Sequence, residues 1–230
     1  MFRKIISKTS ITKRLYEDRF YRTVFFTYFS LGINVIYSIA YAIMGIYKHS
    51  PWHGTLAAFY IFLSIMRFIV LWADYQIKRE AHKRDRYVYI WREYLVVGIL
   101  LTFITFIFLG VVILIINDEG GRSYPGLFIY VICIYTFAKV IFAVKNLFYA
   151  RKKRAPVIAM LRYIGQADAL LSILSLQTAM FASFLETSAE NISFMHTMNM
   201  ATGIVVSLLI AFIGITMIIR AAGKLGKHES

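Results

Sequence analysis

Six long apolar runs, separated by short polar segments, set the pattern of this chain. They lie at Thr23–Tyr47, Gly54–Ile77, Tyr94–Ile116, Gly126–Phe148, Tyr163–Leu185 and Met195–Ile219. Each run has the roughly 20 residues that a helix needs to cross the hydrocarbon core of a bilayer. Runs of this length predict helices, because lipid offers no partner to an unpaired backbone group. The expected fold class is all-α, a polytopic membrane helix bundle with six transmembrane helices.

Basic residues gather in alternate connections, which predicts the orientation of the helices. The N-terminal arm, the second and fourth connections and the C-terminal tail are rich in Lys and Arg, whereas the other connections carry Asp118, Glu119, Glu186 and Glu190. Cytoplasmic loops of membrane proteins carry the excess of Lys and Arg. Both termini are therefore expected in the cytoplasm (N-in/C-in).

The same pattern divides the chain into three parts. Residues 1–22 form a basic arm, residues 23–219 the membrane domain and residues 220–230 a basic cytoplasmic tail. The arm mixes bases with apolar residues, so it is expected either to lie in the headgroup plane as a short amphipathic helix or to be a frayed tail. No continuous apolar signal segment precedes Thr23, so no leader is expected to be removed.

Composition supports a membrane protein and narrows its chemistry. Hydrophobic residues make up 59% of the 230, and the mean hydropathy is +0.64, which excludes an ordinary soluble domain and a disordered chain. The net charge of +14 comes from bases beside the apolar runs. Anionic lipid headgroups account for that charge, so the bilayer is an expected partner and nucleic acid is not. Cys133 is the single cysteine, which excludes an internal disulfide and a cysteine metal site.

Two cationic residues fall near the middle of apolar runs. Arg67 lies in the second run, roughly 15 Å from its cytoplasmic end, and Lys139 lies at a similar depth in the fourth. An ionised group there costs at least ~2.5 kcal/mol and normally faces the bundle interior. The nearest acids in the runs are Asp74 and Asp168. The four charges are expected to form structural ion bridges, or a site for an anion, proton or polar solute; alternatively the two long bases snorkel toward water.

The fifth run carries a stripe of small and polar residues. Its members follow helical steps of three and four: Gly165, Asp168, Ser172, Ser175, Ala179 and Ala182. Such a face allows close helix packing and interhelical hydrogen bonds, and it could alternatively line a watery pathway. Gln177 adds an amide on another face, so this helix is expected to be central. Ser30, Asn34, Ser38 and Tyr41 make a similar stripe in the first run, and the two helices are predicted to face a shared cavity.

Three arginines hint at an internal repeat. Arg22, Arg92 and Arg162 precede the odd-numbered runs at a spacing of 70 residues. The spacing fits three tandem helical hairpins, and internal repeats recur in transporter folds. Any chain of equal hairpins with basic cytoplasmic ends would give a similar spacing, so both interpretations stay open.

Catalytic motifs are missing from the sequence. No metalloprotease, nucleophile-elbow, phosphate-loop or paired-cysteine motif occurs among the 230 residues. The chain is therefore expected not to be an enzyme, and no cofactor and no metal are expected.

The segment LRYIGQADALLSILSLQTAMFASF (residues 161–184) and the preceding IYTFAKVIFAVKNLFYARKKR carry a family resemblance. Over roughly 55 residues, around the fourth and fifth runs, the chain resembles a group of uncharacterised multi-pass membrane proteins of Gram-positive bacteria. The resemblance implies a bacterial plasma membrane and implies no activity.

The leading functional expectation is an integral membrane protein that moves or binds a small solute or ion at an intramembrane polar layer. The candidate site residues are Arg67, Asp74, Lys139, Asp168, Ser172, Ser175, Gln177 and Asn34. The alternative is an accessory or interaction subunit of a membrane complex, in which the buried charges are structural. Its partner would then be another membrane protein or a second copy of the chain.

Overall fold

The computed structural model of the chain describes residues 19–47, 49, 51–79, 83–119, 128–149, 156–185 and 188–229. These residues form α3 (Arg19–Tyr47), α4 (Pro51–Arg79), α5 (Lys83–Glu119), α6 (Phe128–Tyr149), α7 (Pro156–Phe184) and α8 (Ala189–Glu229). Residues 1–18 of the predicted basic arm lie outside the described part. The all-α fold class is confirmed.

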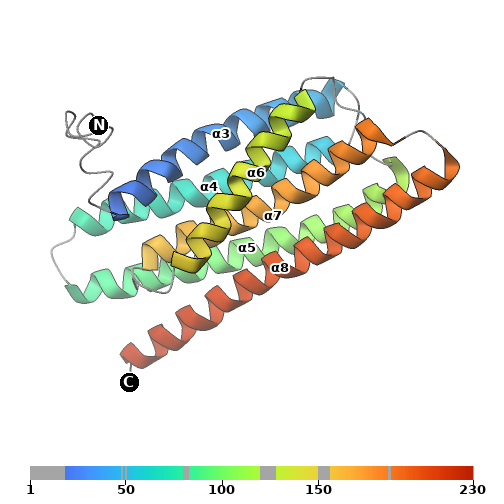
Figure 1. The fold of residues 1–230 in the computed structure, drawn as a ribbon. Helices are drawn as coiled ribbons and strands as arrows, with labels where there is room; N and C mark the ends of the chain where they lie inside the picture. Colours follow the sequence, from blue (N-terminus) through green and yellow to red (C-terminus); the bar gives the residue numbers. More distant parts are fainter. Residues whose placement is uncertain are drawn as a thin grey trace, which may run out of the picture.

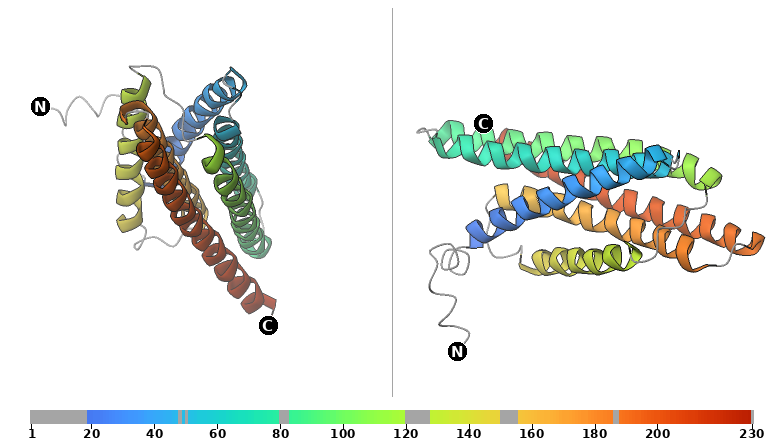
Figure 2. Two further views of the ribbon diagram at one scale, coloured as in Figure 1. Left: turned by 90° about the vertical axis from the view of Figure 1, so that its right-hand side faces the viewer. Right: turned by 90° about the horizontal axis from the view of Figure 1, so that it is seen from above.

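Successive helices run in opposite directions along one bundle axis (Figure 1). The beginning of α3 and the end of α8 consequently lie at the same end of the bundle, and the α3–α4 and α7–α8 turns lie at the other. Two further views show α6 on the flank of the bundle (Figure 2). This up-and-down path is the one that the alternating charge pattern predicts.

Five of the described helices are long and apolar enough to cross a membrane. The candidate spans are Thr27–Tyr47, His53–Gln76, Arg86–Gly110, Pro156–Phe181 and Glu190–Gly226. The fourth predicted span, Gly126–Phe148, coincides closely with α6, which is not among these five, so this span stays a prediction. The helices suit an integral membrane protein.

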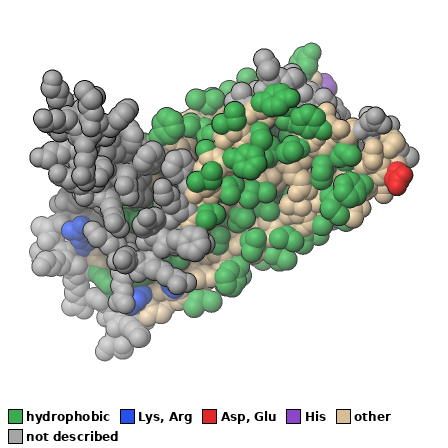
Figure 3. Space-filling model, viewed as in Figure 1, with side chains coloured by type: hydrophobic (Ala, Val, Ile, Leu, Met, Phe, Trp, Pro, Cys, Tyr) green, Lys and Arg blue, Asp and Glu red, His purple; other side chains and the backbone are tan. Residues whose placement is uncertain are grey.

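The surface has the polarity of a membrane protein. In Figure 3 hydrophobic side chains cover the middle of the visible face, Lys and Arg side chains lie at the end that carries the chain termini, and an acidic side chain lies at the opposite end. Exposed hydrophobic residues on α3, such as Ile36, Ile39 and Ile43, contribute to this apolar belt. An apolar belt between charged ends is the arrangement that a bilayer stabilises.

Helix ends follow local sequence signals. Pro156 opens α7, seven residues before the predicted start of the span, because proline is favoured in the first turn of a helix. At α8 the Ser188 hydroxyl oxygen accepts a hydrogen bond from the Asn191 amide (3.2 Å), and Glu190 lies in the first turn. The helix then continues to Glu229, through most of the residues predicted as the tail.

Helices α5 and α8 approach each other most closely through glycines. A Cβ atom added to Gly98 of α5 would lie 3.0 Å from the Met217 Cβ atom of α8. One added to Gly214 would collide with the Thr102 hydroxyl oxygen and lie 3.1 Å from the Gly98 carbonyl oxygen. One added to Gly203 would lie 2.5 Å from a methyl carbon of Val112. Small residues in transmembrane helices allow such close backbone approach. The small-residue stripe of the fifth run predicts this kind of packing for α7 and not for the α5–α8 pair.

Helix pairing differs from three tandem hairpins. α3 packs along α4, and α7 packs along α8, as consecutive hairpins would. Among the described residues, however, α5 packs along α8 and α6 along α7, and α5 and α6 do not form an extended contact. Helices α5 and α6, which would form the middle hairpin, therefore do not pack along each other, and α5 packs along α8 through faces that carry glycines. Helix α7 contacts every other described helix, as its predicted central position requires.

Candidate functional site

The polar stripe of α7 faces the bundle interior. Asp168, Ser172 and Ser175 are each at most 2% exposed, and Ala179 is fully buried on the same face. This face meets α3, α4 and α6, whose own polar side chains point toward it. The middle of the predicted stripe, from Asp168 to Ala179, is therefore buried, whereas Gly165 is partly buried and the side chain of Ala182 lies outside the described part.

Asp168 is the centre of the site because it pairs with both bases that the sequence predicts to lie near mid-span. The Arg67 Nη2 atom of α4 lies 2.8 Å from Asp168 Oδ2, and the Lys139 Nζ atom of α6 lies 2.7 Å from Oδ1. The side chains of the three residues are at most 9% exposed. Two cations thus share one carboxylate, and the bundle rather than lipid surrounds the charges.

Helix α3 adds neutral partners to these charges. The Asn34 amide group is fully buried; its Nδ2 atom donates to Asp168 Oδ2 and its Oδ1 atom accepts from Lys139 Nζ, both at 3.2 Å. Arg67 Nη1 donates to the Ser30 hydroxyl at 2.8 Å. The first and fifth runs therefore meet at one polar layer, as their matching stripes predict.

Ser172 lies one helical turn beyond Asp168 and connects α7 to α4. Its hydroxyl donates to the Asp168 backbone carbonyl oxygen at 2.8 Å and accepts from Lys139 Nζ at 3.2 Å. The Tyr60 hydroxyl oxygen lies 3.2 Å from Ser172 Oγ. Because the Ser172 proton is used by the carbonyl oxygen, Tyr60 is the donor in this contact. We refer to Asn34, Arg67, Lys139, Asp168 and Ser172 as the polar cluster.

Three tyrosine rings surround the Lys139 ammonium. Its Nζ atom lies 4.6 Å from the ring centroid of Tyr135, 5.0 Å from that of Tyr60 and 5.7 Å from that of Tyr37. The Tyr37 and Tyr135 rings stack at 4.8 Å, and Tyr60 stacks on Tyr41 at 5.7 Å. A cation within about 6 Å of an aromatic face is attracted by the ring quadrupole.

A second polar layer lies beside the cluster, toward the α3–α4 turn. The Tyr41 and Ser175 hydroxyl oxygens are 2.5 Å apart and join α3 to α7. Ser38 donates to the Ala57 carbonyl oxygen at 3.2 Å and joins α3 to α4. Ser175 is thus a predicted site residue that the structure places next to the polar cluster, in a helix-to-helix hydrogen bond.

Two predicted site residues lie elsewhere. Asp74 is buried on α4, roughly 10 Å along the helix axis from Arg67, and the contacts that define the cluster do not include it. Gln177 faces α8. Its Nε2 atom donates to the Met198 carbonyl oxygen (3.2 Å), and its Oε1 atom accepts from the Thr202 hydroxyl (3.0 Å). Gln177 therefore joins two helices outside the cluster.

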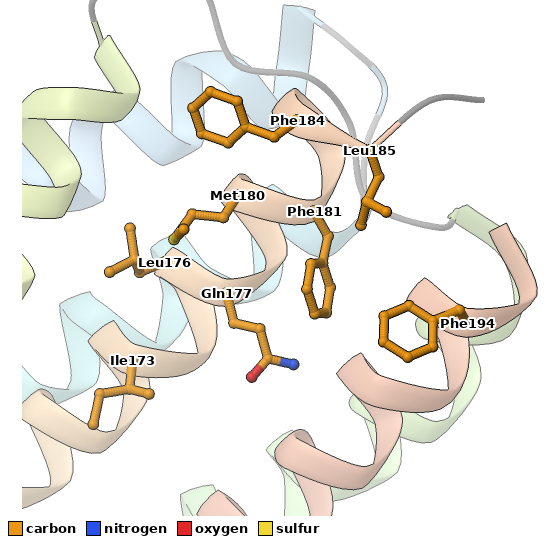
Figure 4. A pocket seen from close by; sticks show the side chains of 8 residues that line it. All are labelled: Ile173, Leu176, Gln177, Met180, Phe181, Phe184, Leu185 and Phe194. Atoms are coloured by element: carbon orange, nitrogen blue, oxygen red, sulfur yellow. The ribbon is translucent and has the colours of Figure 1, made fainter. Parts of the chain in front are cut away.

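An apolar groove of about 480 Å³ opens between α7 and α8 (Figure 4). Its lining side chains are Ile173, Leu176, Gln177, Met180, Phe181, Phe184, Leu185 and Phe194. None of them belongs to the polar cluster. Phe184 and Phe194 are 61% and 47% exposed, so the groove is part of the apolar outer surface.

The chemistry available at the cluster is ion pairing and hydrogen bonding. Within the described residues the cluster holds two cationic side chains and one carboxylate, which leaves one positive charge in excess. No group of three His, Cys, Asp or Glu side chains that could hold a metal ion occurs in the described part of the chain.

Three members of the site were not among the predicted site residues, namely Tyr37, Tyr60 and Tyr135. The spacing of two of them was an available signal, since Tyr135 precedes Lys139 by four residues and Tyr60 precedes Arg67 by seven. Both intervals place the two side chains on one helix face. Tyrosine usually marks the membrane interface, so a mid-span tyrosine beside a base is itself informative.

Comparison with known proteins does not assign the chain to a family. No protein-family model matches the chain, and no curated protein matches it at a significant level. The resemblance of residues around the fourth and fifth runs to a group of bacterial membrane proteins stays a prediction.

Proposed function

We propose that the protein is an integral membrane protein with six transmembrane helices, both termini in the cytoplasm, that binds a small solute or ion at the polar cluster and moves it across the membrane. The single observation that carries the proposal is the convergence of Arg67 and Lys139 on Asp168 inside an apolar bundle. Buried intramembrane charges commonly mark ion or solute pathways. The chain is proposed not to be an enzyme.

The composition of the cluster supports exchange rather than packing alone. Its excess positive charge is expensive in a membrane interior, so a purely structural cluster would do better with one base fewer. Lys139 also comes from α6, which among the described helices forms an extended contact with α7 alone. A charged side chain on a helix at the flank is well placed to leave and return.

Reconstitution into liposomes tests the proposal. Wild-type protein should give a protein-dependent flux of at least one probe from a panel of H⁺, Na⁺, K⁺, Cl⁻, amino acids and short amines, followed with pH- and potential-sensitive dyes and with labelled solutes. Asp168→Asn should reduce that flux at least roughly tenfold, since a charge-assisted contact of about 1.5 kcal/mol or more is lost.

A matched control lies on the same helix. Gln177→Met keeps the side-chain volume and lies outside the cluster, so its flux should stay near the wild-type value. Absence of flux for every probe in folded wild-type protein, or equal flux in Asp168→Asn, would remove the transport proposal.

The second candidate function is an accessory subunit of a membrane complex, and full pairing of the cluster favours it. The three donors of the Lys139 ammonium face three acceptors, and both Asp168 oxygens are used. Purification from native membranes in mild detergent separates the two candidates. A stoichiometric membrane-protein partner, together with no flux from the isolated chain, would favour the subunit.

A further inference from the structure

The acceptors around the Lys139 ammonium form a cup that other helices build. Asp168 Oδ1 lies 2.7 Å from Nζ, and Asn34 Oδ1 and Ser172 Oγ each lie 3.2 Å from it. An ammonium group has three N–H donors and no acceptor, so the set satisfies it fully. The acceptors come from α3 and α7, and none comes from α6, the helix that carries Lys139.

Aromatic rings close the cup. The Tyr60, Tyr37 and Tyr135 centroids lie 5.0, 5.7 and 4.6 Å from Nζ and belong to α4, α3 and α6. A carboxylate combined with several aromatic faces is the chemistry that proteins use to bind organic ammonium groups. The geometry favours a cation over an anion, because each of the three hydrogen-bonding atoms that face Nζ is an acceptor.

The cup has contacts that do not depend on Lys139. Arg67 and Asn34 both donate to Asp168 Oδ2, which holds the carboxylate in place. Ser172 is held by its bond to the Asp168 carbonyl oxygen and by Tyr60. A site held in this way keeps its shape when the ammonium leaves, which is the requirement for binding a second ligand.

Hydrogen bonding favours exchange of one ammonium for another. Departure of Lys139 alone would leave Asp168 paired with Arg67 and the acceptors of Asn34 and Ser172 unfilled. Entry of a second ammonium fills these acceptors again. Solute binding at this position is therefore compatible with the burial of the site, as long as the solute carries a primary ammonium.

We propose that the cup formed by Asp168, Asn34, Ser172 and the rings of Tyr60, Tyr37 and Tyr135 is a binding site for a solute with a primary ammonium group, and that Lys139 is the resident group which this solute displaces. The inference rests on the proposed function and names the class of solute.

Titration of the purified protein with n-propylammonium chloride tests the inference. This ion matches the part of the lysine side chain that Lys139→Ala removes. It should raise the thermal unfolding midpoint of Lys139→Ala by roughly 3 °C at ten times its Kd, and wild-type protein should show the same kind of shift at higher concentration. Sodium chloride and tetramethylammonium chloride at equal ionic strength should give neither shift, because they cannot donate three N–H bonds.

Cup variants provide the matched controls. Tyr135→Leu should weaken n-propylammonium binding to wild-type protein at least roughly fivefold, whereas Tyr130→Leu, at an exposed tyrosine of the same helix, should leave it unchanged. If Lys139→Ala does not fold, this pair decides the matter in the wild-type background. If n-propylammonium shifts the unfolding midpoint of Lys139→Ala but never that of the wild type, the solute does not displace Lys139, and the inference is overturned. No shift in either protein would overturn it as well.

The outcomes separate this inference from the proposed function. Binding of n-propylammonium with no flux of any probe would keep the ammonium site and remove transport. Flux of another ion with no ammonium binding would keep transport and remove the ammonium site.

Discussion

Asp168 is the residue on which the charged interior of the bundle depends. It is 1% exposed, and its carboxylate pairs with both Arg67 and Lys139. Removing one partner of a buried ion pair costs about 3–5 kcal/mol, because it strands the other charge. The loss of stability on substitution should therefore differ among Asp168, Arg67 and Lys139, since one carboxylate pairs with two bases.

Asp168→Asn should be far more destabilising than Lys139→Met. The first change leaves two buried cations unpaired and is expected to lower the free energy of unfolding by about 3–5 kcal/mol. The second leaves a neutral Arg67–Asp168 pair and should cost less than half as much. Unfolding of the purified variants in a mixed-micelle SDS titration measures both.

The double variant checks the cause of this inequality. Asp168→Asn with Lys139→Met restores the wild-type charge of the cluster, so its loss of stability should be smaller than the sum of the two single losses. Strict additivity, or a larger cost for Lys139→Met, would contradict the shared-carboxylate description.

At the scale of elements, α8 is joined to α5 by shape and to α7 by hydrogen bonds. Gly98 and Gly214 bring the backbones of α5 and α8 together, whereas Gln177 connects α7 to α8. Transmembrane helices associate through such packing, because lipid removes the hydrophobic drive between them. Helix α6 lacks an extended contact of this kind with any described helix but α7, and Lys139 and Tyr135 connect it to α3 and α4.

Gly214→Ala should separate α5 from α8. The new methyl group would collide with Thr102 and crowd the Gly98 carbonyl oxygen, and backbone atoms cannot yield as a flexible side chain can. Overpacking of this kind costs about 1–3 kcal/mol, to be measured as the free energy of unfolding in the same SDS titration.

Gly223→Ala is the matched control on the same helix. A Cβ atom there would meet nothing within 4 Å, so the variant should be neutral or up to about 1 kcal/mol more stable through helix propensity. Equal effects of the two substitutions would refute a packing role for Gly214.

Charged side chains are distributed unevenly along the bundle axis of the molecule. Basic side chains gather at the end where the chain terminates, and the start of α8, with Glu190 in its first turn, lies at the opposite end. This asymmetry predicts which end faces the cytoplasm.

Single-cysteine labelling tests the orientation of the whole chain. In a Cys133→Ser background, Ser188→Cys should react with a membrane-impermeant maleimide in intact cells. Ser230→Cys, at the last residue of the sequence, should react only after the membrane is opened. Labelling of both sites from outside would exclude an odd number of crossings between them and therefore the proposed topology; the reverse pattern would invert it.

Much of this arrangement was predictable, for reasons that differ from residue to residue. The apolar runs dictate helices because their length matches the bilayer and their backbone has no other partner there. The stripe from Asp168 to Ala179 and the stripe through Asn34 dictate which faces are buried, since helical spacing alone brings their members together. The position of Gln177 against α8 was not predictable, because its amide lies on a different face of α7 and spacing cannot tell which neighbour that face meets.

The sequence by itself determined the elements, the faces they bury and the presence of charge inside the bundle, because these depend on local periodicity and on the bilayer. Tertiary structure alone decided that Arg67 and Lys139 meet at Asp168, that tyrosine rings enclose Lys139, and that α5 pairs with α8. These contacts join residues far apart in the sequence, such as Arg67 and Asp168, which are 101 positions apart, and they depend on how glycine-bearing and polar surfaces fit in three dimensions.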